Sequence, residues 1–237
     1  MPRECCASVR LADAQRVFVS RTYAYVAAGK EGLVIVDVQT GSIAQSLGMR
    51  PGDVLLLTKA LGTGVLFAAH ARLAAQGRWI DEALASMMLS NRLAARCLLT
   101  SGATACTDVT GFGLLGHLLE MTRASGVHVE VDLDALPALK GVEDVLARGI
   151  VSSLHSANAG QDVHVRNRQE ASGHPRYPLI FDPQTAGGLL ASVPAERIGA
   201  CINALRGSGY ASAVAIGRVL RADADLPPVL LRRMARR

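Results

Sequence analysis

A seven-residue segment, Thr-Asp-Val-Thr-Gly-Phe-Gly at positions 107–113, holds the residue types needed to bind a metal–nucleotide complex. Its carboxylate is a hard oxygen ligand that suits Mg²⁺, and its threonines add hydroxyl donors. Its glycines let the backbone approach a ligand closely, and the helix expected after it favours phosphate at its N-terminus. The candidate contacts to the nucleotide are Thr107, Asp108, Thr110, Gly111 and Gly113, with Asp108 as the metal ligand. The alternative is a helix cap in which Thr110 only satisfies free backbone amides.

A second polar loop, Asp-Pro-Gln-Thr-Ala-Gly-Gly at positions 182–188, lies between two apolar stretches. Its side chains offer a carboxylate, an amide and a hydroxyl, and its two glycines permit close packing or unusual backbone dihedral angles. We expect Asp182, Gln184 and Thr185 to contact the nucleotide. A tight connection between two strands is the alternative.

The remaining candidates for chemistry are weaker. Lys59 precedes Gly62-Thr-Gly64, but this segment lacks the G-x-x-x-x-G-K-[ST] spacing of a phosphate-binding loop. A strand-to-helix turn with an exposed Lys59 is therefore favoured over a phosphate grip. His117 and Glu120 are three residues apart on an expected helix, and the H-E-x-x-H pattern of a zinc site is absent from the sequence. All six histidines are interpreted as structural or surface residues.

Composition narrows the class of protein. Of the 237 residues, 50% are hydrophobic and 19% are charged, which is typical of a globular protein with a substantial core. Aromatic residues make up only 4%, which argues against the stacking surfaces that bind single-stranded nucleic acid. The formal net charge is +5, and four arginines crowd the C-terminus. A solvated tail is favoured there over a contact with nucleic acid or an acidic partner, so no nucleic-acid partner is expected.

The five cysteines are too scattered for a disulfide framework and lack the paired spacing of a zinc site. No apolar run has the length of a membrane span, and the first residues contain no apolar stretch typical of a signal peptide. The sequence therefore predicts a cytoplasmic protein that does not act at a membrane.

Strands and helices are interleaved along the chain. Two short strands, at 23–27 and 33–38, are predicted to form an N-terminal β-hairpin, and a polar linker follows from Gln39 to Arg50. Further strands are expected at 54–57, 104–109, 127–133, 179–181, 189–193 and 214–220. Helices are expected at 65–76, with Gly77 as its stop, and then at 81–97 with Asp81 as its cap, 114–125, 141–148 and 194–207. A long loop is expected from 152 to 177. This order predicts an α+β fold, a mixed β-sheet with packed helices, preceded by the short hairpin.

Three stretches together resemble one family. Residues 51–64 (Pro-Gly-Asp-Val-Leu-Leu-Leu-Thr-Lys-Ala-Leu-Gly-Thr-Gly), 105–117 and 179–190 are similar to selenophosphate synthetase, in its order and roughly its spacing. The resemblance covers about Pro51 to Leu220 and implies a PurM C-terminal-like domain of the aminoimidazole-ribonucleotide-synthetase superfamily. Ala60 stands where that family usually has Pro, and Ala186 where it usually has Ser.

The resemblance also implies an activity. The family makes selenophosphate, AMP and phosphate from ATP, selenide and water, with Mg²⁺, and serves selenium metabolism and selenocysteine biosynthesis. Asp108 would bind Mg²⁺–ATP at a cleft between two domains. Because the family's catalytic Cys and Lys belong to an N-terminal domain with no counterpart here, no catalytic residue is expected in this chain. ATP and selenide are expected as partners only when an N-terminal half completes the site. A non-catalytic truncated or fused product, binding at most a nucleotide or a partner, is the alternative.

The expected organisation has three parts. Residues 1–40 form a hairpin segment, of which 14–40 resemble a single LVIVD-type repeat, a unit that buries its faces only against neighbours. Residues 41–222 form the selenophosphate-synthetase-like domain, and residues 223–237 form a basic tail. An apolar interface for the N-terminal half would remain exposed, so self-association or a homodimer is expected unless the hairpin covers that surface.

Overall fold

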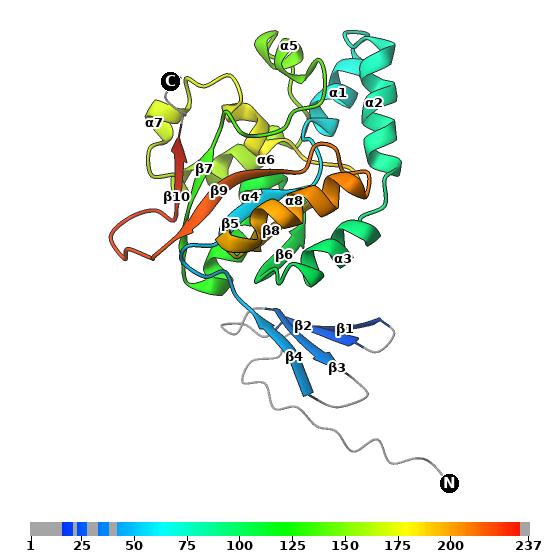
Figure 1. The fold of residues 1–237 in the computed structure, drawn as a ribbon. Helices are drawn as coiled ribbons and strands as arrows, with labels where there is room; N and C mark the ends of the chain where they lie inside the picture. The colour runs from blue at the N-terminus through cyan, green and yellow to red at the C-terminus, as the bar shows by residue number, and fades with distance from the viewer. Residues whose placement is uncertain (1–15, 21–22, 28–32, 38–41, 233–237) are drawn as a thin grey trace.

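The computed structural model describes residues 16–20, 23–27, 33–37 and 42–232, which form two separate β-sheets with helices around the larger one (Figure 1). The predicted α+β class, a mixed sheet with packed helices, is confirmed.

The N-terminal sheet has four antiparallel strands in chain order: β1 (Arg16–Ser20), β2 (Tyr23–Ala27), β3 (Leu33–Asp37) and β4 (Ser42–Leu47). The expected hairpin corresponds to β2 and β3, which pair antiparallel. The predicted polar linker from Gln39 is wrong where β4 lies. Its polar residues hide a strand that pairs with β3 through a register shift near Ile35 and Val36.

The larger sheet has six strands in the order β10-β7-β9-β5-β8-β6. These are β5 (Val54–Leu57), β6 (Ala105–Asp108), β7 (His128–Asp132), β8 (Leu189–Val193), β9 (Val214–Leu220) and β10 (Val229–Arg232). Strand β10 runs parallel to β7, and the other neighbours are antiparallel. Strand β6 therefore forms one edge of the sheet.

Helices cover both faces of this sheet (Figure 1). They are α1 (Thr63–Ala71), α2 (Gly77–Met88), α3 (Arg92–Thr100), α4 (Gly113–Ser125), α5 (Val142–Ala147), α6 (His155–Ala159), α7 (Arg168–Ala171) and α8 (Ile198–Gly207). Successive residues of β5 face opposite sides, as strand geometry requires. Leu55 and Leu57 join the core that contains α1 and α4, whereas Leu56 joins the smaller core beneath α3 and α8.

The described residues also include the short 3₁₀ helices η2 (Gly160–His164), η3 (Tyr177–Phe181) and η4 (Ala195–Arg197), of which η2 and η3 correct predictions. The strand expected at 179–181 is η3, whose apolar residues are buried against α4. A short apolar run fits a strand or a buried helical turn equally well. The long loop expected at 152–177 is also wrong, because α6, η2 and α7 occupy most of it.

The first two predicted helices have shifted boundaries. Helix α1 ends at Ala71, before Leu73 takes a left-handed conformation with φ of 54°. Gly77 does not stop a helix but begins α2, and Asp81 lies inside α2 rather than at its cap. The predicted helix at 81–97 is two helices, since the chain becomes extended at Leu89.

The expected basic tail begins within the fold. Strand β10 pairs with β7, with Val229 and Leu231 almost fully buried. Arg232 Nε lies 2.6 Å from Glu130 Oε2. Residues 233–237 lie outside the described part of the chain.

None of the helices in the described ranges has the length and apolar character required to span a membrane.

Candidate functional site

The candidate loops meet at one end of three neighbouring strands of the larger sheet, an end that we call the site edge. Asp108 on β6 is level with Leu189 on β8, and Leu190 is level with Leu57 on β5. Because β8 is antiparallel to both neighbours, β5 and β6 end where β8 begins, at the site edge. The segments that follow β5 and β6 and the segment that precedes β8 therefore meet here.

Asp108 is the last residue of edge strand β6 and is exposed to solvent. Within residues 48–232 its carboxylate makes no hydrogen bond or ion pair. Both oxygens are therefore available to a ligand.

The turn after Asp108 is fixed by close backbone contacts. Gly113 has φ of 69°, a left-handed conformation that L side chains rarely adopt. A Cβ atom at Gly113 would lie 2.9 Å from the carbonyl oxygen of Ile180 and 2.9 Å from the carbonyl carbon of Phe181. Glycine is needed here because the turn rests on η3, and this need is independent of any ligand.

His117 anchors the same turn from the first turns of α4. The backbone N–H of Thr110 donates to His117 Nε2 at 3.0 Å, and the Thr110 hydroxyl lies 3.1 Å from the same atom. Since an amide can only donate, Nε2 is the acceptor and the proton of the neutral ring is on Nδ1. Glu120 Oε2 lies 3.4 Å from Nδ1, in a geometry that makes no hydrogen bond. His117 thus has a structural role, as predicted.

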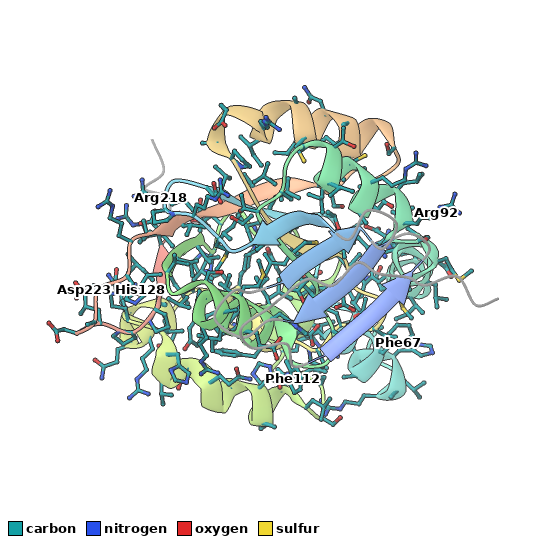
Figure 2. The ribbon with its side chains drawn as sticks, turned by 90° about the horizontal axis from the view of Figure 1, so that it is seen from below. Phe67, Arg92, Phe112, His128, Arg218 and Asp223 are labelled. Atoms are coloured by element: carbon teal, nitrogen blue, oxygen red, sulfur yellow. The ribbon has the colours of Figure 1, made fainter. Side chains whose placement is uncertain are left out.

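Thr110 does not cap α4, because no side chain makes a capping bond at that helix. The Thr107 hydroxyl is partly exposed and donates to the Asp108 carbonyl at 3.3 Å. The Gly111 carbonyl accepts a bond from Asn158 Nδ2 at 2.9 Å. Phe112, labelled in Figure 2, is 57% exposed, and its ring centroid lies 5.8 Å from that of His117. Of the five predicted contacts in the turn, Asp108 is the most exposed.

Asp182 has the opposite environment, since it is fully buried. Its Oδ2 accepts a hydrogen bond from Gln184 Nε2 at 2.9 Å, while Oδ1 makes no hydrogen bond of good geometry. Burial raises the pKa of Asp182 to about 7, and the backbone amides of Val65 and Gly64 and the Gln184 side chain offset this rise only partly. The carboxylate faces the start of α1.

Gln184 is also buried and supports the same helix start. Its Oε1 accepts bonds from the backbone amides of Gly62 at 3.0 Å and Thr63 at 3.2 Å, and from the Thr63 hydroxyl at 3.1 Å. Thr185 donates its backbone N–H to Thr63 Oγ1 at 3.0 Å and is itself exposed. Of the three predicted contacts in this loop, Thr185 is exposed, and the buried Asp182 and Gln184 join the loop to the start of α1.

Lys59 is buried, with 4% exposure, so the prediction of an exposed side chain is wrong. Its Nζ donates to the carbonyls of Leu89 at 2.5 Å and Ala186 at 3.1 Å. Burial lowers the pKa of Lys59. The junction between α2 and α3 lies over the end of β5. Because Leu89 is 30 residues from Lys59 along the chain, the sequence around Lys59 did not indicate its burial.

Two asparagines near the site were missed in the sequence. Asn158 also donates to the carbonyl of Phe181 at 3.0 Å, so it joins the turn to η3. Asn91 Nδ2 donates to the carbonyl of Gly187 at 2.9 Å. Both donate to backbone carbonyls far away in sequence, a role that no motif reveals.

Asp108 fits a metal site as one ligand only. Within residues 48–232, no three His, Cys, Asp or Glu side chains lie close enough together to hold a metal ion jointly. Mg²⁺ is often held by one or two carboxylates together with substrate phosphates and water. A free carboxylate at the exposed end of β6 suits that mode of binding.

Most of the chain matches a known protein family. Residues 50–225 match the family described as AIR synthase related protein, C-terminal domain, and the chain belongs to that family. Residues 12–43 match the LVIVD repeat family, which confirms the second resemblance.

The similar curated proteins are selenide, water dikinases. That of Geobacter metallireducens is 42% identical over 193 residues, which cover 81% of this chain and 55% of the relative. That of Burkholderia pseudomallei is 38% identical over 188 residues, covering 77% and 52%. The chain thus spans about half the length of the curated relatives it matches.

Solved structures share the fold. The hydrogenase maturation protein HypE aligns with a TM-score of 0.57 and 19% identity, over 78% of this chain and 51% of that structure. HypE from E. coli aligns with a TM-score of 0.54 and 18% identity, over 79% and 47%. At these identities the likeness concerns the fold alone.

Proposed function

We propose that this chain forms one wall of the Mg²⁺–ATP cleft of a cytoplasmic selenide, water dikinase. The complete enzyme would convert ATP, selenide and water to selenophosphate, AMP and phosphate. The proposal rests on the family, on relatives at about 40% identity over most of the chain, and on the geometry of the site edge.

The observation that carries the proposal is the free carboxylate of Asp108 on a rigid turn. His117, Asn158 and η3 hold the backbone that follows it, yet the carboxylate itself has no partner within residues 48–232. A rigid support that leaves one ligand unsatisfied suits a binding site, because little ordering is left to do on binding.

The proposed contacts divide into two groups. Asp108 contacts the metal, and Thr107 and Thr185, which face solvent at least in part, contact the nucleotide directly. The buried Asp182 and Gln184 act by holding the start of α1 in place. The backbone of Gly111 and Gly113, in the same turn as Asp108, completes the proposed contacts with the nucleotide.

Mg²⁺ would neutralise charge on the phosphates when bound. Its other ligands must come from the nucleotide and from groups outside residues 48–232, since Asp108 supplies only one. Phosphoryl transfer needs metals and cationic groups positioned together. We therefore expect this chain alone to bind Mg²⁺–ATP without turning it over.

The domain division is part of the proposal. The N-terminal repeat-like segment, predicted to end at residue 40, would extend through β4 to Leu47 because β4 pairs with β3. The domain that follows would extend to Arg232 because β10 completes the larger sheet. Helices α2 and α3 expose Leu84, Met88, Leu93 and Leu99. We expect self-association through this apolar surface, which sedimentation velocity would reveal as a concentration-dependent increase in mass.

Calorimetric titration tests the metal contact. Mg²⁺–ATP is titrated into the unmodified chain, into Asp108→Asn and into the control Asp81→Asn. Asp81 is also exposed but lies on α2, away from the turn. We expect the affinity to fall at least about tenfold in Asp108→Asn only, which corresponds to roughly 1.4 kcal/mol. Equal affinities in all three proteins would remove Asp108 from the site.

A complementation assay tests the activity. Selenide-dependent AMP release is measured for this chain alone, and again with the N-terminal half of the Geobacter metallireducens relative added. We expect release only from the mixture, and less of it with Asp108→Asn. Release from neither sample, with nucleotide still bound, would favour the non-catalytic alternative.

A further inference from the structure

Lys59 is a buried cation whose charge is not matched by an acid. Its side chain is almost fully enclosed, and no acidic group in the described residues 48–232 forms an ion pair with it. Burying an ammonium group without a counter-charge is costly unless hydrogen bonds replace its water. Here two backbone carbonyls do so, and such charge-assisted bonds are stronger than neutral ones.

The two bonds of Lys59 join segments far apart in sequence. Leu89 lies at the junction of α2 and α3, and Ala186 lies in the loop before β8. Asn91 adds a second bond from the same junction to Gly187. The Tyr210 hydroxyl donates to the carbonyl of Ser90 at 2.5 Å, which fixes the junction to the body of the domain. The loop before β8 is thus bonded to the α2–α3 junction, which is itself bonded to Tyr210 in the body of the domain.

This tied loop lies directly against the Asp108 turn. Ala186 has φ of 49°, a conformation that only surrounding contacts hold in a residue other than glycine. The next residue, Gly187, passes so close to the carbonyl of Val109 that a Cβ atom would clash with it. The N–H of Val109 donates to the carbonyl of Gly188 at 2.9 Å. Val109 directly follows Asp108, so the loop determines where the Asp108 backbone, and with it the carboxylate, is positioned.

We propose that Lys59 is a positioning residue of the candidate site. It holds residues 186–188 in place, and through Val109 it fixes Asp108. The effect on the ligand rests on the proposed function of Asp108, whereas the effect on the turn does not. Lys59 acts through the loop and touches neither metal nor nucleotide.

Hydrogen exchange measured on the full chain tests the effect on the turn without any ligand. Lys59→Met keeps most of the length of the side chain and removes its donors. The matched control is Lys140→Met, because Lys140 is exposed and its pairing with Glu82 is at the surface. We expect at least about tenfold faster exchange in peptides covering 105–113 and 186–190 in Lys59→Met, with β7 and β9 unchanged. Exchange equal to that of Lys140→Met would overturn the proposal.

Mg²⁺–ATP titration separates positioning from general stability. The comparison variant is Thr104→Val, which removes a buried hydroxyl bonded to Asp53 and Ser192. Thr104 directly precedes β6, so it lies at the opposite end of that strand from Asp108. We expect the affinity for Mg²⁺–ATP to fall by about tenfold in Lys59→Met. It should not fall in Thr104→Val when the two variants have lost a similar amount of melting temperature. Equal weakening in both variants would show that Lys59 acts on the fold as a whole and would overturn the proposal.

A milder variant keeps the test decisive if Lys59→Met does not fold. Asn91→Ala removes only the bond to Gly187, and we expect the same peptides to exchange about threefold faster; unchanged exchange would count against the proposal. If the unmodified chain binds no Mg²⁺–ATP, the proposed function fails. The exchange result still decides whether Lys59 positions the turn.

Discussion

Asp108 and Asp182 lie at the same edge of the same sheet, in loops of similar composition, yet their surroundings are opposite. Asp108 is exposed and has no partner within residues 48–232, whereas Asp182 is fully buried and bonded to Gln184. One carboxylate is available to a ligand, and the other is part of the fold. The comparison teaches that a polar loop at a site edge contains both contacts and supports.

The difference follows from the position of each aspartate in the sheet. Strand β6 is an edge strand, and its last residue, Asp108, is exposed to solvent. Asp182 instead follows η3, directly below the start of α1. Gly64 has no side chain, and a Cβ atom there would lie 2.6 Å from Asp182 Oδ1. The close approach of helix and loop is what encloses the carboxylate.

The largest expected effect is the loss of stability in Asp182→Ala. The substitution removes a buried acceptor from Gln184 and leaves a cavity beneath the start of α1. We expect the free energy of unfolding to fall by about 2–4 kcal/mol, which lowers the melting temperature by roughly 4–16 °C for a chain of this size. Chemical denaturation measures it, with Asp108→Ala as the control. A loss below about 1 kcal/mol would mean that Asp182 is dispensable to the fold.

The second effect is a pH dependence of stability that arises from Asp182. Burial raises its pKa from 3.8 to about 7, so the folded protein keeps a proton that the unfolded chain releases. The stability from this proton is present below pH 3.8 and is lost as the pH rises through about 7. Each pKa unit is worth about 1.4 kcal/mol, so the decline is a few kcal/mol at most.

Asp182→Asn isolates this contribution, because other titrating groups are the same in both proteins. The difference in unfolding free energy between the two proteins, measured from pH 4 to pH 8, should change in the direction that favours the variant as the pH rises. A constant difference across this range would show that Asp182 titrates normally.

The sequence predicted well the elements that are determined locally. Helix α4 ends at Ser125, and the next residue, Gly126, adopts the left-handed conformation expected directly after a helix. Strand β7 and helix α8 also follow their patterns, because each buries one face of a regular element. The position of Asp108 at the end of a strand followed from the same reasoning.

What the sequence did not predict depends on long-range contacts. Lys59 bonds to residues 30 and 127 positions away, and Gln184 bonds to residues 121 and 122 positions away. Burial of a polar side chain depends on such distant partners, which a single sequence does not reveal. The predicted contacts therefore included both supports and free ligands, and only the fold separates them.

The third effect concerns the support beneath Asp108. His117→Leu removes the acceptor for the Thr110 amide, which is then left without a partner in a partly buried turn. We expect a loss of about 1–2 kcal/mol and faster exchange of the Thr110 amide. The matched control is His70→Leu, at an exposed position near the end of α1. If both variants behave alike, the turn does not depend on His117.

The smallest expected effect is the most informative about the comparison. Asp108→Ala should change the free energy of unfolding by less than about 0.5 kcal/mol, as is usual for exposed positions without partners. The same substitution should abolish most of the Mg²⁺–ATP affinity if the proposed contact is correct. A carboxylate that contributes to binding and not to stability is one that the fold holds ready for a ligand. A stability loss near that of Asp182→Ala would instead mean that Asp108 has an internal partner, and the contrast between the two aspartates would disappear.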